Sequence, residues 1–348
     1  MADYTIHNQD CREAMAAMEA NSIDAIVTDP PYFKVKGEAW DRQWDKPEQF
    51  LAWLGEIADE WARLLKPNGS LYCFASPRMA ARVEVLLSER FNVLNRIVWS
   101  KAGEDGVSGA GRHRGAEKES LRAFFPATEH IIFAEHHGAD LTALGLSTYA
   151  AKCDELRGFV FEPLRAYLAD EWMRAGLTAR DANEATSTQM AGHWFTRVQW
   201  ALPTQNHYNT LRLRANATGG DYLRREYDDL RREYDDLRKE FESLRRPFSV
   251  TPDVPYTDVW TFKTVNAYHG KHPCEKPAEM MEHIIRASCT PGSVVLDPFM
   301  GSGTTGVAAG RLGMRFIGCE LDADYAKIAE ARIAHAYREA FPLASCGG

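Results

Sequence analysis

Residues 23–32 read Ile-Asp-Ala-Ile-Val-Thr-Asp-Pro-Pro-Tyr, and this stretch determines the predicted fold. Its first five residues are mostly apolar, which predicts a short buried strand. Asp29 then lies at the carboxyl end of that strand, where open α/β sheets bind ligands. The two prolines fix φ and remove two backbone donors, so the turn is rigid and its carbonyl oxygens face no competing N–H groups. Such a turn either merely ends a strand or holds a flat ligand whose amino group donates to the carboxylate and a carbonyl.

The sequence on both sides of this stretch predicts alternating strands and helices. Strands are predicted at residues 4–11, 23–27, 70–75, 91–99 and 128–134, and helices at 12–20, 48–65 and 77–90. Residues 66–69, Lys-Pro-Asn-Gly, predict a helix stop followed by a turn. The β-α-β-α-β alternation is typical of a parallel sheet. With 348 residues, the chain suits one large α/β domain with an insertion, or two domains.

Composition narrows the classes of function. No stretch approaches the roughly 18 apolar residues of a membrane span, and the N-terminus lacks a basic-then-apolar signal, so we expect a cytoplasmic protein. The seven cysteines show no Cys-x-x-Cys spacing, which favours free thiols over disulfides or zinc. Because the net charge is −8, any DNA must bind to local basic clusters on an otherwise acidic protein.

A glycine-rich loop follows Lys101 and carries three candidate DNA-binding residues, Arg112, His113 and Arg114. A flexible loop with a basic tip can close on a phosphate backbone. The alternative is a solvated connection between strands.

Residues 136–220 have helical periodicity and few β-branched runs. A helix is predicted at 161–174, and Thr178 is a natural N-cap for a second helix at 179–185, with a third at 189–196. This is the layout of a helix-turn-helix, whose second helix enters the major groove. Three side chains would then lie near base edges: Gln189, His193 and Arg197. The alternative is a small helical subdomain with a core of Trp194, Phe195 and Trp200.

Residues 226–246 contain a seven-residue repeat, Glu-Tyr-Asp-Asp-Leu-Arg-Arg and two variants of it. The spacing places leucine, tyrosine and phenylalanine on one face of a helix. The predicted helix, residues 221–246, would be about 40 Å long and is supported by the i,i+4 pairs Asp228–Arg232 and Asp235–Lys239. The apolar face either forms an arm at a dimer interface or, because its aromatic residues are bulky, packs on its own domain.

A second motif follows the predicted buried strand at residues 293–296. Asp297 comes first, and Gly301, Gly303 and Gly306 then satisfy the pattern G-x-G-x-x-G, with Glu320 19 positions after the first glycine. The pattern allows a dinucleotide site but not a P-loop, because no lysine follows the glycines. Asp297 would repel a pyrophosphate and attract an α-ammonium group. S-adenosylmethionine therefore fits better, with its ammonium near Asp297 and its ribose on Glu320.

Together the two motifs resemble the β group of DNA amino-methyltransferases, in which the Asp-Pro-Pro-Tyr turn comes first and the cofactor loop last. The resemblance covers roughly residues 4–135 and 250–338. It implies an α/β, Rossmann-like methyltransferase fold, a doubly wound, mostly parallel sheet in permuted motif order. Residues 1–135 would be its catalytic half and 250–348 its cofactor-binding half. Between them, residues 136–249 would be an inserted, mainly helical target-recognition region with the helix-turn-helix at about 161–200 and the heptad arm at about 221–246. This arrangement is similar to that of phage-type orphan enzymes.

The resemblance also implies roles for individual residues. It assigns catalysis to Asp29, Pro30, Pro31 and Tyr32. It assigns binding of S-adenosylmethionine to Asp10, Cys11, His272, Lys276, Pro277, Asp297, Phe299, Gly301, Gly303, Thr304, Thr305 and Glu320.

The predicted activity is methyl transfer to the N6 amino group of an adenine flipped out of duplex DNA. Adenine is preferred because cytosine N4 enzymes of the resembled family more often carry serine where this chain has Asp29. Cytosine N4 is the first alternative, and a nicotinamide-dependent oxidoreductase and a catalytically silent DNA-binding regulator are the others. The expected partners are duplex DNA and a second copy of the chain, with no membrane and no metal.

Overall fold

The computed structural model describes residues 3–34, 42–101, 124, 127–136, 157–197, 199–244, 246–250, 256–266 and 274–340. These residues divide into two compact units. The first, the sheet unit, comprises the described parts of Met1–Thr142 and Arg246–Gly348. The second, the helical unit, comprises those of Ala143–Arg245.

The sheet unit is built on one eight-stranded sheet in the order β1-β8-β7-β2-β3-β5-β4-β6. Its strands are β1 (Tyr4–His7), β2 (Ile23–Thr28), β3 (Leu65–Ala75), β4 (Phe91–Ser100), β5 (Thr128–His136), β6 (Val259–Trp260), β7 (Val294–Asp297) and β8 (Arg315–Cys319). Only β5, among the described strands, runs antiparallel to its neighbours. The predicted α/β fold with a mostly parallel sheet is therefore confirmed.

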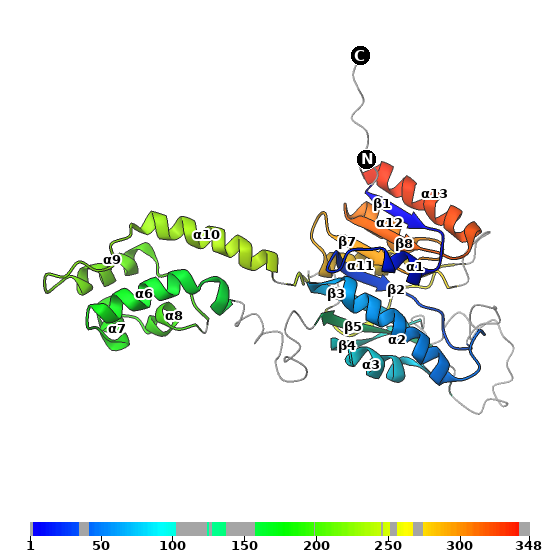
Figure 1. Cartoon of the computed structure of the whole chain (residues 1–348), viewed down its shortest axis with the longest axis horizontal. Coiled ribbons are helices and arrows are strands. Elements are labelled where there is room, and N and C mark those ends of the chain that lie inside the picture. The colour runs from blue at the N-terminus through cyan, green and yellow to red at the C-terminus, as the bar shows by residue number, and fades with distance from the viewer. Residues whose placement is uncertain are drawn as a thin grey trace, which may run out of the picture. The chain divides into compact units, whose positions relative to one another are not determined.

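Six helices of the sheet unit pack on the two faces of the sheet (Figure 1). They are α1 (Cys11–Ala16), α2 (Pro47–Leu64), α3 (Ala80–Ser88), α11 (Ala278–Ser288), α12 (Thr304–Arg311) and α13 (Ala323–Ala340). Side chains alternate along β2, so Ile26 packs with α1, α2 and α3, whereas Ala25 and Val27 pack with α11, α12 and α13. Both faces of β2 are therefore buried, which explains its nearly continuous apolar sequence.

Two features of the sheet differ from the sequence prediction. The predicted turn at residues 66–69 is wrong, because these residues belong to β3, where the pairing shifts between Ile23↔Leu65 and Ala25↔Ser70 as in a large bulge. The proline and glycine of this segment thus interrupt a strand and do not separate two elements. Moreover, β5 runs antiparallel to β3 and β4, since the β-α-β alternation that predicts parallel strands stops at β4.

The helical unit contains α6 (Glu162–Arg174), α7 (Ala179–Thr186), α8 (Ala191–Phe195), α9 (Gln205–Ala215) and α10 (Tyr227–Leu244). Thr178 is the N-cap of α7, as predicted, and forms a capping box with Asp181. The apolar core of this unit contains Trp194 and Trp200, with Phe195 packed against it. These three aromatic residues form the core predicted for a small helical subdomain.

The seven-residue repeat forms α10, which begins six residues later than predicted. Its apolar face packs on its own unit, because Leu230 and Phe241 are buried in the core and the Tyr234 ring stacks on Phe161 at 5.3 Å between centroids. The predicted ion pairs are wrong. The side-chain pairs that form are Asp229–Arg232, Arg231–Asp235 and Asp236–Lys239. A dimer of the chain stays a prediction.

We expect Leu230→Ala to destabilise the helical unit by about 2–5 kcal/mol, because the fully buried side chain leaves a cavity in a packed core. Hydrogen exchange of the amides of α6 and α10 measures the local free energy of unfolding. The matched control is Leu213→Ala on α9, whose side chain is 76% exposed and should change this value by less than about 0.5 kcal/mol. Equal effects of the two substitutions would contradict the packing of α10 on its own unit.

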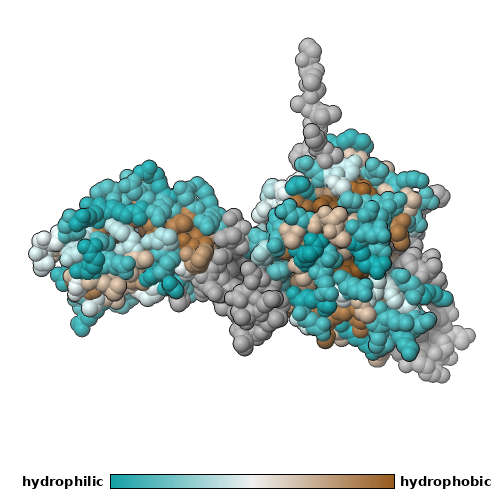
Figure 2. Space-filling model, in the orientation of Figure 1, coloured by the Kyte–Doolittle hydropathy of each residue, from teal (hydrophilic) through white to brown (hydrophobic). Residues whose placement is uncertain are grey.

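The surfaces of both units are mostly hydrophilic in the view of Figure 2. Among the helices that the structure describes, none combines the length and the apolar character needed to cross a membrane.

Candidate active site

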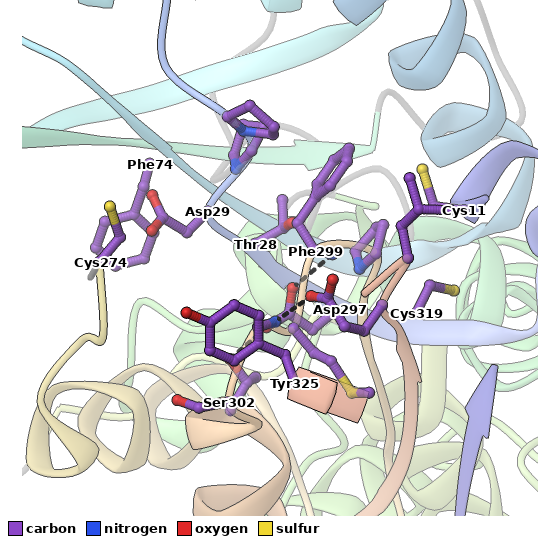
Figure 3. Close-up of a pocket in the computed structure, with 18 of the residues that line it drawn as sticks. Cys11, Thr28, Asp29, Phe74, Cys274, Asp297, Phe299, Ser302, Cys319 and Tyr325 are labelled. Atoms are coloured by element: carbon purple, nitrogen blue, oxygen red, sulfur yellow. Dashed lines mark hydrogen bonds between the residues drawn. The ribbon is translucent and has the colours of Figure 1, made fainter. Parts of the chain in front are cut away.

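The two sequence motifs meet at the carboxyl ends of adjacent strands. Strand β2, which precedes Asp29, pairs with β7, which ends in Asp297, through Ala25↔Val295 and Ile26↔Leu296. A cavity of about 780 Å³ opens at this edge of the sheet. In Figure 3, Asp29 lies beside Phe74 and Cys274, Cys11 and Cys319 lie on the opposite side, and Asp297 lies between the two groups.

Most of the predicted site residues line this cavity. They are Asp10, Cys11, Asp29, Pro30, Pro31, Tyr32, Lys276, Asp297, Phe299, Gly301, Thr304, Thr305 and Glu320. The cavity therefore brings together residues from the N-terminal and C-terminal thirds of the chain. Predicted residues His272, Arg112, His113 and Arg114 lie outside the described residues.

Asp29 lies in a largely buried environment, where one carboxylate oxygen accepts a hydrogen bond and the other has no donor among the described residues. Its side chain is 20% exposed, and Oδ2 accepts a hydrogen bond from Lys276 Nζ. Oδ1 is buried and accepts no hydrogen bond from any described residue. Burial raises the pKa of the Asp29 carboxyl, and the Lys276 ammonium opposes that rise. An unpartnered buried acceptor of this kind is suited to a donor supplied by a ligand.

Lys276 differs from its expected position on the cofactor side. Its ammonium binds the predicted catalytic carboxylate of Asp29 and lies 3.4 Å from Glu129 Oε2. Glu129 in turn accepts hydrogen bonds from Lys101 Nζ and, at 3.4 Å, from the Tyr32 hydroxyl. Glu129 and Lys101 escape prediction from the sequence, because β5 and the end of β4 approach the site only in the folded sheet. The one sequence signal that could have pointed to Glu129 is its position next to the apolar run of β5.

Asp297 is buried at the centre of the cavity wall. Oδ1 accepts a hydrogen bond from the backbone N–H of Phe299 at 3.1 Å, and Oδ2 accepts one from the Thr305 hydroxyl at 2.6 Å (Figure 3). Burial raises the pKa of Asp297 to about 7. A cationic group in the cavity would favour the ionised carboxylate, which keeps lone pairs free for it.

The glycine loop uses its glycines for two different purposes. Gly301 lines the cavity, and its N–H donates to Glu320 Oε2 at 3.0 Å. Gly303 was predicted to bind the cofactor but does not line the cavity. It has a φ of 82°, and a Cβ there would lie 2.8 Å from Ala329 Cβ, so this glycine allows α12 to pack closely on α13.

The remaining predicted residues are held by helix ends. Asp10 is the N-cap of α1 and accepts hydrogen bonds from the backbone and guanidinium of Arg12, which hold the pKa of its carboxyl below the usual value. Pro277 is the N-cap of α11 and is not among the residues that line the cavity, so its contact with the cofactor stays a prediction.

The cavity has aromatic walls that the sequence motifs do not contain. Trp53 of α2 packs on Phe299 at 5.7 Å between centroids, and Phe74 of β3 and Tyr325 of α13 also line the cavity. These residues occupy ordinary apolar positions in their elements, so no local pattern distinguishes them. Flat aromatic walls suit the bases of a nucleoside or a nucleotide.

The predicted helix-turn-helix has no recognition helix of ordinary length. Helix α8 has only five residues, and one of them, Trp194, belongs to the core. Among the residues proposed to read bases, Arg197 forms an ion pair with Glu162, and the Gln189 amide oxygen accepts from Asn183 at 3.3 Å. His193 lies within the same short helix, where its ring nitrogen is 3.3 Å from the carbonyl oxygen of Gln199. Helix α8, the predicted recognition helix, therefore packs mainly in the core of the helical unit.

Known proteins resemble this chain over nearly its whole length. The family model described as DNA methylase, which covers N6 and N4 enzymes, matches residues 23–331. The type II methyltransferase M2.LlaDCHI of Lactococcus lactis subsp. cremoris is 49% identical over 342 residues, covering 93% of this chain and 87% of the relative. M2.DpnII of Streptococcus pneumoniae, also a type II methyltransferase, is 26% identical over 344 residues, covering 94% and 88%.

A solved structure supports the fold. The PvuII DNA methyltransferase, described as cytosine-N4-specific, superposes with a TM-score of 0.50 at 13% identity, covering 97% of this chain and 94% of that one. At this identity the likeness concerns the fold alone. The extent of the family match and the near-half identity to one relative show that the chain belongs to the N6/N4 DNA methylase family and is a DNA methyltransferase of that family.

Proposed function

We propose that the protein transfers a methyl group from S-adenosylmethionine to the N6 amino group of an adenine flipped out of duplex DNA. The observation that carries the proposal is Asp29, which lines the same cavity as Asp297 and whose buried Oδ1 is an acceptor without a hydrogen-bond partner among the described residues. In this proposal Asp29 accepts hydrogen bonds from an uncharged amine, and Asp297 attracts a cation. The two requirements of amine methylation are thus met in one cavity.

The residues of the cavity fit the proposed cofactor. Its volume, about 780 Å³, lies in the range of cavities that hold cofactors. Asp297 supplies the anionic group for an α-ammonium, and Glu320 supplies carboxylate oxygens for ribose hydroxyls. The aromatic walls at Trp53, Phe299 and Tyr325 suit an adenine ring. When bound, the sulfonium supplies an electrophilic methyl group without a metal or a covalent enzyme intermediate.

The turn at Asp29 performs the activation of the amine. The lone pair of an exocyclic amine is delocalised into the base and is a poor nucleophile. Hydrogen bonds from its two N–H groups to Asp29 Oδ1 and the Pro30 carbonyl oxygen would localise that lone pair, while the Tyr32 ring stacks on the base. Positioning and electrostatics then provide most of the rate enhancement. The proton released after transfer passes to Asp29 or to water.

The helical unit is the proposed target-recognition region. Helix α9 exposes three amide side chains on its surface, Gln205, Asn206 and Asn209. Amide side chains form bidentate hydrogen bonds with adenine in the major groove. Flipping the target base costs a few kcal/mol, which contacts between this unit and DNA would offset.

The proposal is tested with S-adenosylmethionine labelled in its methyl group and duplex DNA of mixed sequence. Digestion of the DNA to nucleosides and mass spectrometry identify the modified base. The expected product is N6-methyladenine at a defined sequence. Label on cytosine N4 would show that cytosine, and not adenine, is the target base. Label on cytosine C5, or no label in DNA, would refute the mechanism at Asp29.

We expect binding of S-adenosylmethionine to weaken about tenfold for each pH unit between pH 7 and pH 5. The physical reason is that Asp297, with its pKa of about 7, is mostly ionised above pH 7 and becomes protonated as the pH falls from 7 to 5, while only the ionised form attracts the ammonium. Isothermal titration calorimetry measures the dissociation constant. Asp297→Asn should bind the cofactor weakly at all these pH values and lose the pH dependence. An unchanged pH profile in this variant would show that another group controls binding.

A further inference from the structure

Four charged side chains form a connected network behind the proposed site of the target amine. Lys276 Nζ contacts Asp29 Oδ2 and lies 3.4 Å from Glu129 Oε2, and Glu129 Oε1 accepts from Lys101 Nζ. The side chain of Lys276 is 7% exposed and that of Glu129 is 13% exposed. The network contains two carboxylates and two ammonium groups. It is therefore electrically balanced within a largely dry environment.

The position of the Lys276 ammonium is fixed from several directions. It lies 5.4 Å from the centroid of the Tyr32 ring and 5.1 Å from that of Phe74, and it is 3.4 Å from the carbonyl oxygen of Cys274. Aromatic faces attract a cation, and buried walls restrict its stem. The lysine therefore has one defined position, from which it donates to Oδ2 of Asp29, while Oδ1 has no donor among the described residues.

We propose that Lys276 and Glu129 act as a positioning pair for Asp29. Lys276 holds Oδ2 so that Oδ1 points to the target amine, and Glu129 shares the ammonium so that Asp29 remains a good acceptor. This inference rests on the proposed function for the identity of the amine. It removes Lys276 from the cofactor-binding group and gives Glu129, which no motif contains, a part in the reaction.

The two partners act on Asp29 in opposite directions. Loss of the Lys276 charge would remove the attraction that stabilises the ionised Asp29 and leave the negative charge of Glu129 nearby. Both changes favour the protonated carboxyl of Asp29. Loss of the Glu129 charge would leave the whole ammonium to Asp29, which stabilises the ionised carboxylate and weakens it as an acceptor. If Lys276 and Glu129 served only packing, removing their charges would not shift the pKa of Asp29 in opposite directions.

Other titratable groups also face Asp29. They are Tyr32 in the same turn, Cys73 on β3, Asp297 at the end of β7, and Cys274 before α11, which lies beside Asp29 in Figure 3. Burial raises the pKa of the Tyr32 hydroxyl and of the Cys73 thiol, so both stay neutral near pH 7. Asp297 titrates near pH 7, and its ionisation also opposes that of Asp29. The experiment is therefore repeated in the Asp297→Asn background.

The first measurement is an NMR titration of carboxyl-13C-labelled aspartate, with Asp29→Asn used to assign the Asp29 signal. We expect Lys276→Met to raise the pH at which Asp29 titrates by about 1 to 3 pH units and Glu129→Gln to lower it. The double variant should lie between the two single variants, and Lys276→Arg should restore a value near that of the wild type. Lys327→Met, which replaces a 76% exposed lysine of α13, is the matched control and should change nothing. An unchanged titration, or a change in the same direction for both single variants, would overturn the pairing.

The second measurement separates the pair from the cofactor site. The acidic limb of the kcat–pH profile should move with the NMR titration in each variant, while the dissociation constant of S-adenosylmethionine stays within about twofold of the wild type. If Lys276→Met weakened binding of S-adenosylmethionine tenfold and left the acidic limb of the kcat–pH profile unchanged, Lys276 would belong to the cofactor site and the proposal would be refuted. If the wild type methylates no DNA, the proposed function fails, but the NMR titration still decides whether the pair controls Asp29.

Discussion

Asp29→Ala should lower kcat for methyl transfer by at least about 10²–10³-fold, the loss that follows removal of one preorganised hydrogen-bonding group from an active site. The substitution removes Oδ1, the buried acceptor with no partner among the described residues, so the lone pair of the target amine would remain delocalised. Cofactor binding should persist, because Asp297 and the glycine loop are untouched. Single-turnover transfer of labelled methyl groups and calorimetry of S-adenosylmethionine measure the two effects separately.

Two variants make this test specific. Asp29→Asn keeps the shape and one carbonyl oxygen, and it should lose less activity than Asp29→Ala. Asp324→Ala replaces a 91% exposed carboxylate on α13 and should leave kcat unchanged. Activity near that of the wild type in Asp29→Ala would mean that the carboxylate does not contact the amine, whatever base is modified.

Arg246→Met should destabilise the sheet unit by about 3–5 kcal/mol, because it removes the guanidinium that pairs with the buried carboxylate of Glu135. The two side chains are 6% and 4% exposed, and Arg246 Nε donates to Glu135 Oε2 at 2.9 Å. The guanidinium also lies over the rings of Phe133 and Phe248. Urea denaturation followed by tryptophan fluorescence measures the free energy of unfolding.

The origin of this loss is testable with a second substitution. Arg246→Met combined with Glu135→Gln should recover most of the stability, because the buried charge is gone while the amide oxygen can still accept from Asn92. The control is Arg286→Met, whose partner Glu282 lies on the same helix and whose side chain is 59% exposed, with an expected effect of about 0–1 kcal/mol. If the double variant were no more stable than Arg246→Met, the lost stability would come from packing of Arg246 on the aromatic rings and not from the buried charge of Glu135.

The parts of this molecule that were predicted from sequence are those encoded locally. The strand before Asp29 and the strand before Asp297 were recognised because both are short, apolar and followed by polar turns. Their adjacency followed from the rule that ligand sites in such sheets lie at strand ends. The N-cap at Thr178 was predicted because capping depends on a side chain and the next few residues.

The parts that were missed depend on contacts between distant residues. Glu129 reaches the site only because β5 inserts between β3 and β4, which no local pattern indicates. The heptad spacing of α10 predicted an apolar face but not its partner, and that face packs on α6 and its neighbours. Gly303 matched a cofactor pattern, whereas its conformation and its contact with α13 give it a role in helix packing. A motif therefore located the loop without distinguishing the functions of its members.

The ion pair between Arg246 and Glu135 also bears on how the sheet unit accommodates the inserted helical unit. Glu135 lies near the end of β5, and Arg246 is the first residue of the sheet unit after the helical unit. The ion pair therefore joins two parts of the sheet unit that are 111 positions apart and lie on either side of the helical unit in the sequence. An insertion whose two ends meet can be exchanged for another of different length without moving any strand. If the helical unit is the target-recognition region that we propose, exchange of the segment between these two residues would change the DNA sequence that is methylated while the sheet keeps its chemistry.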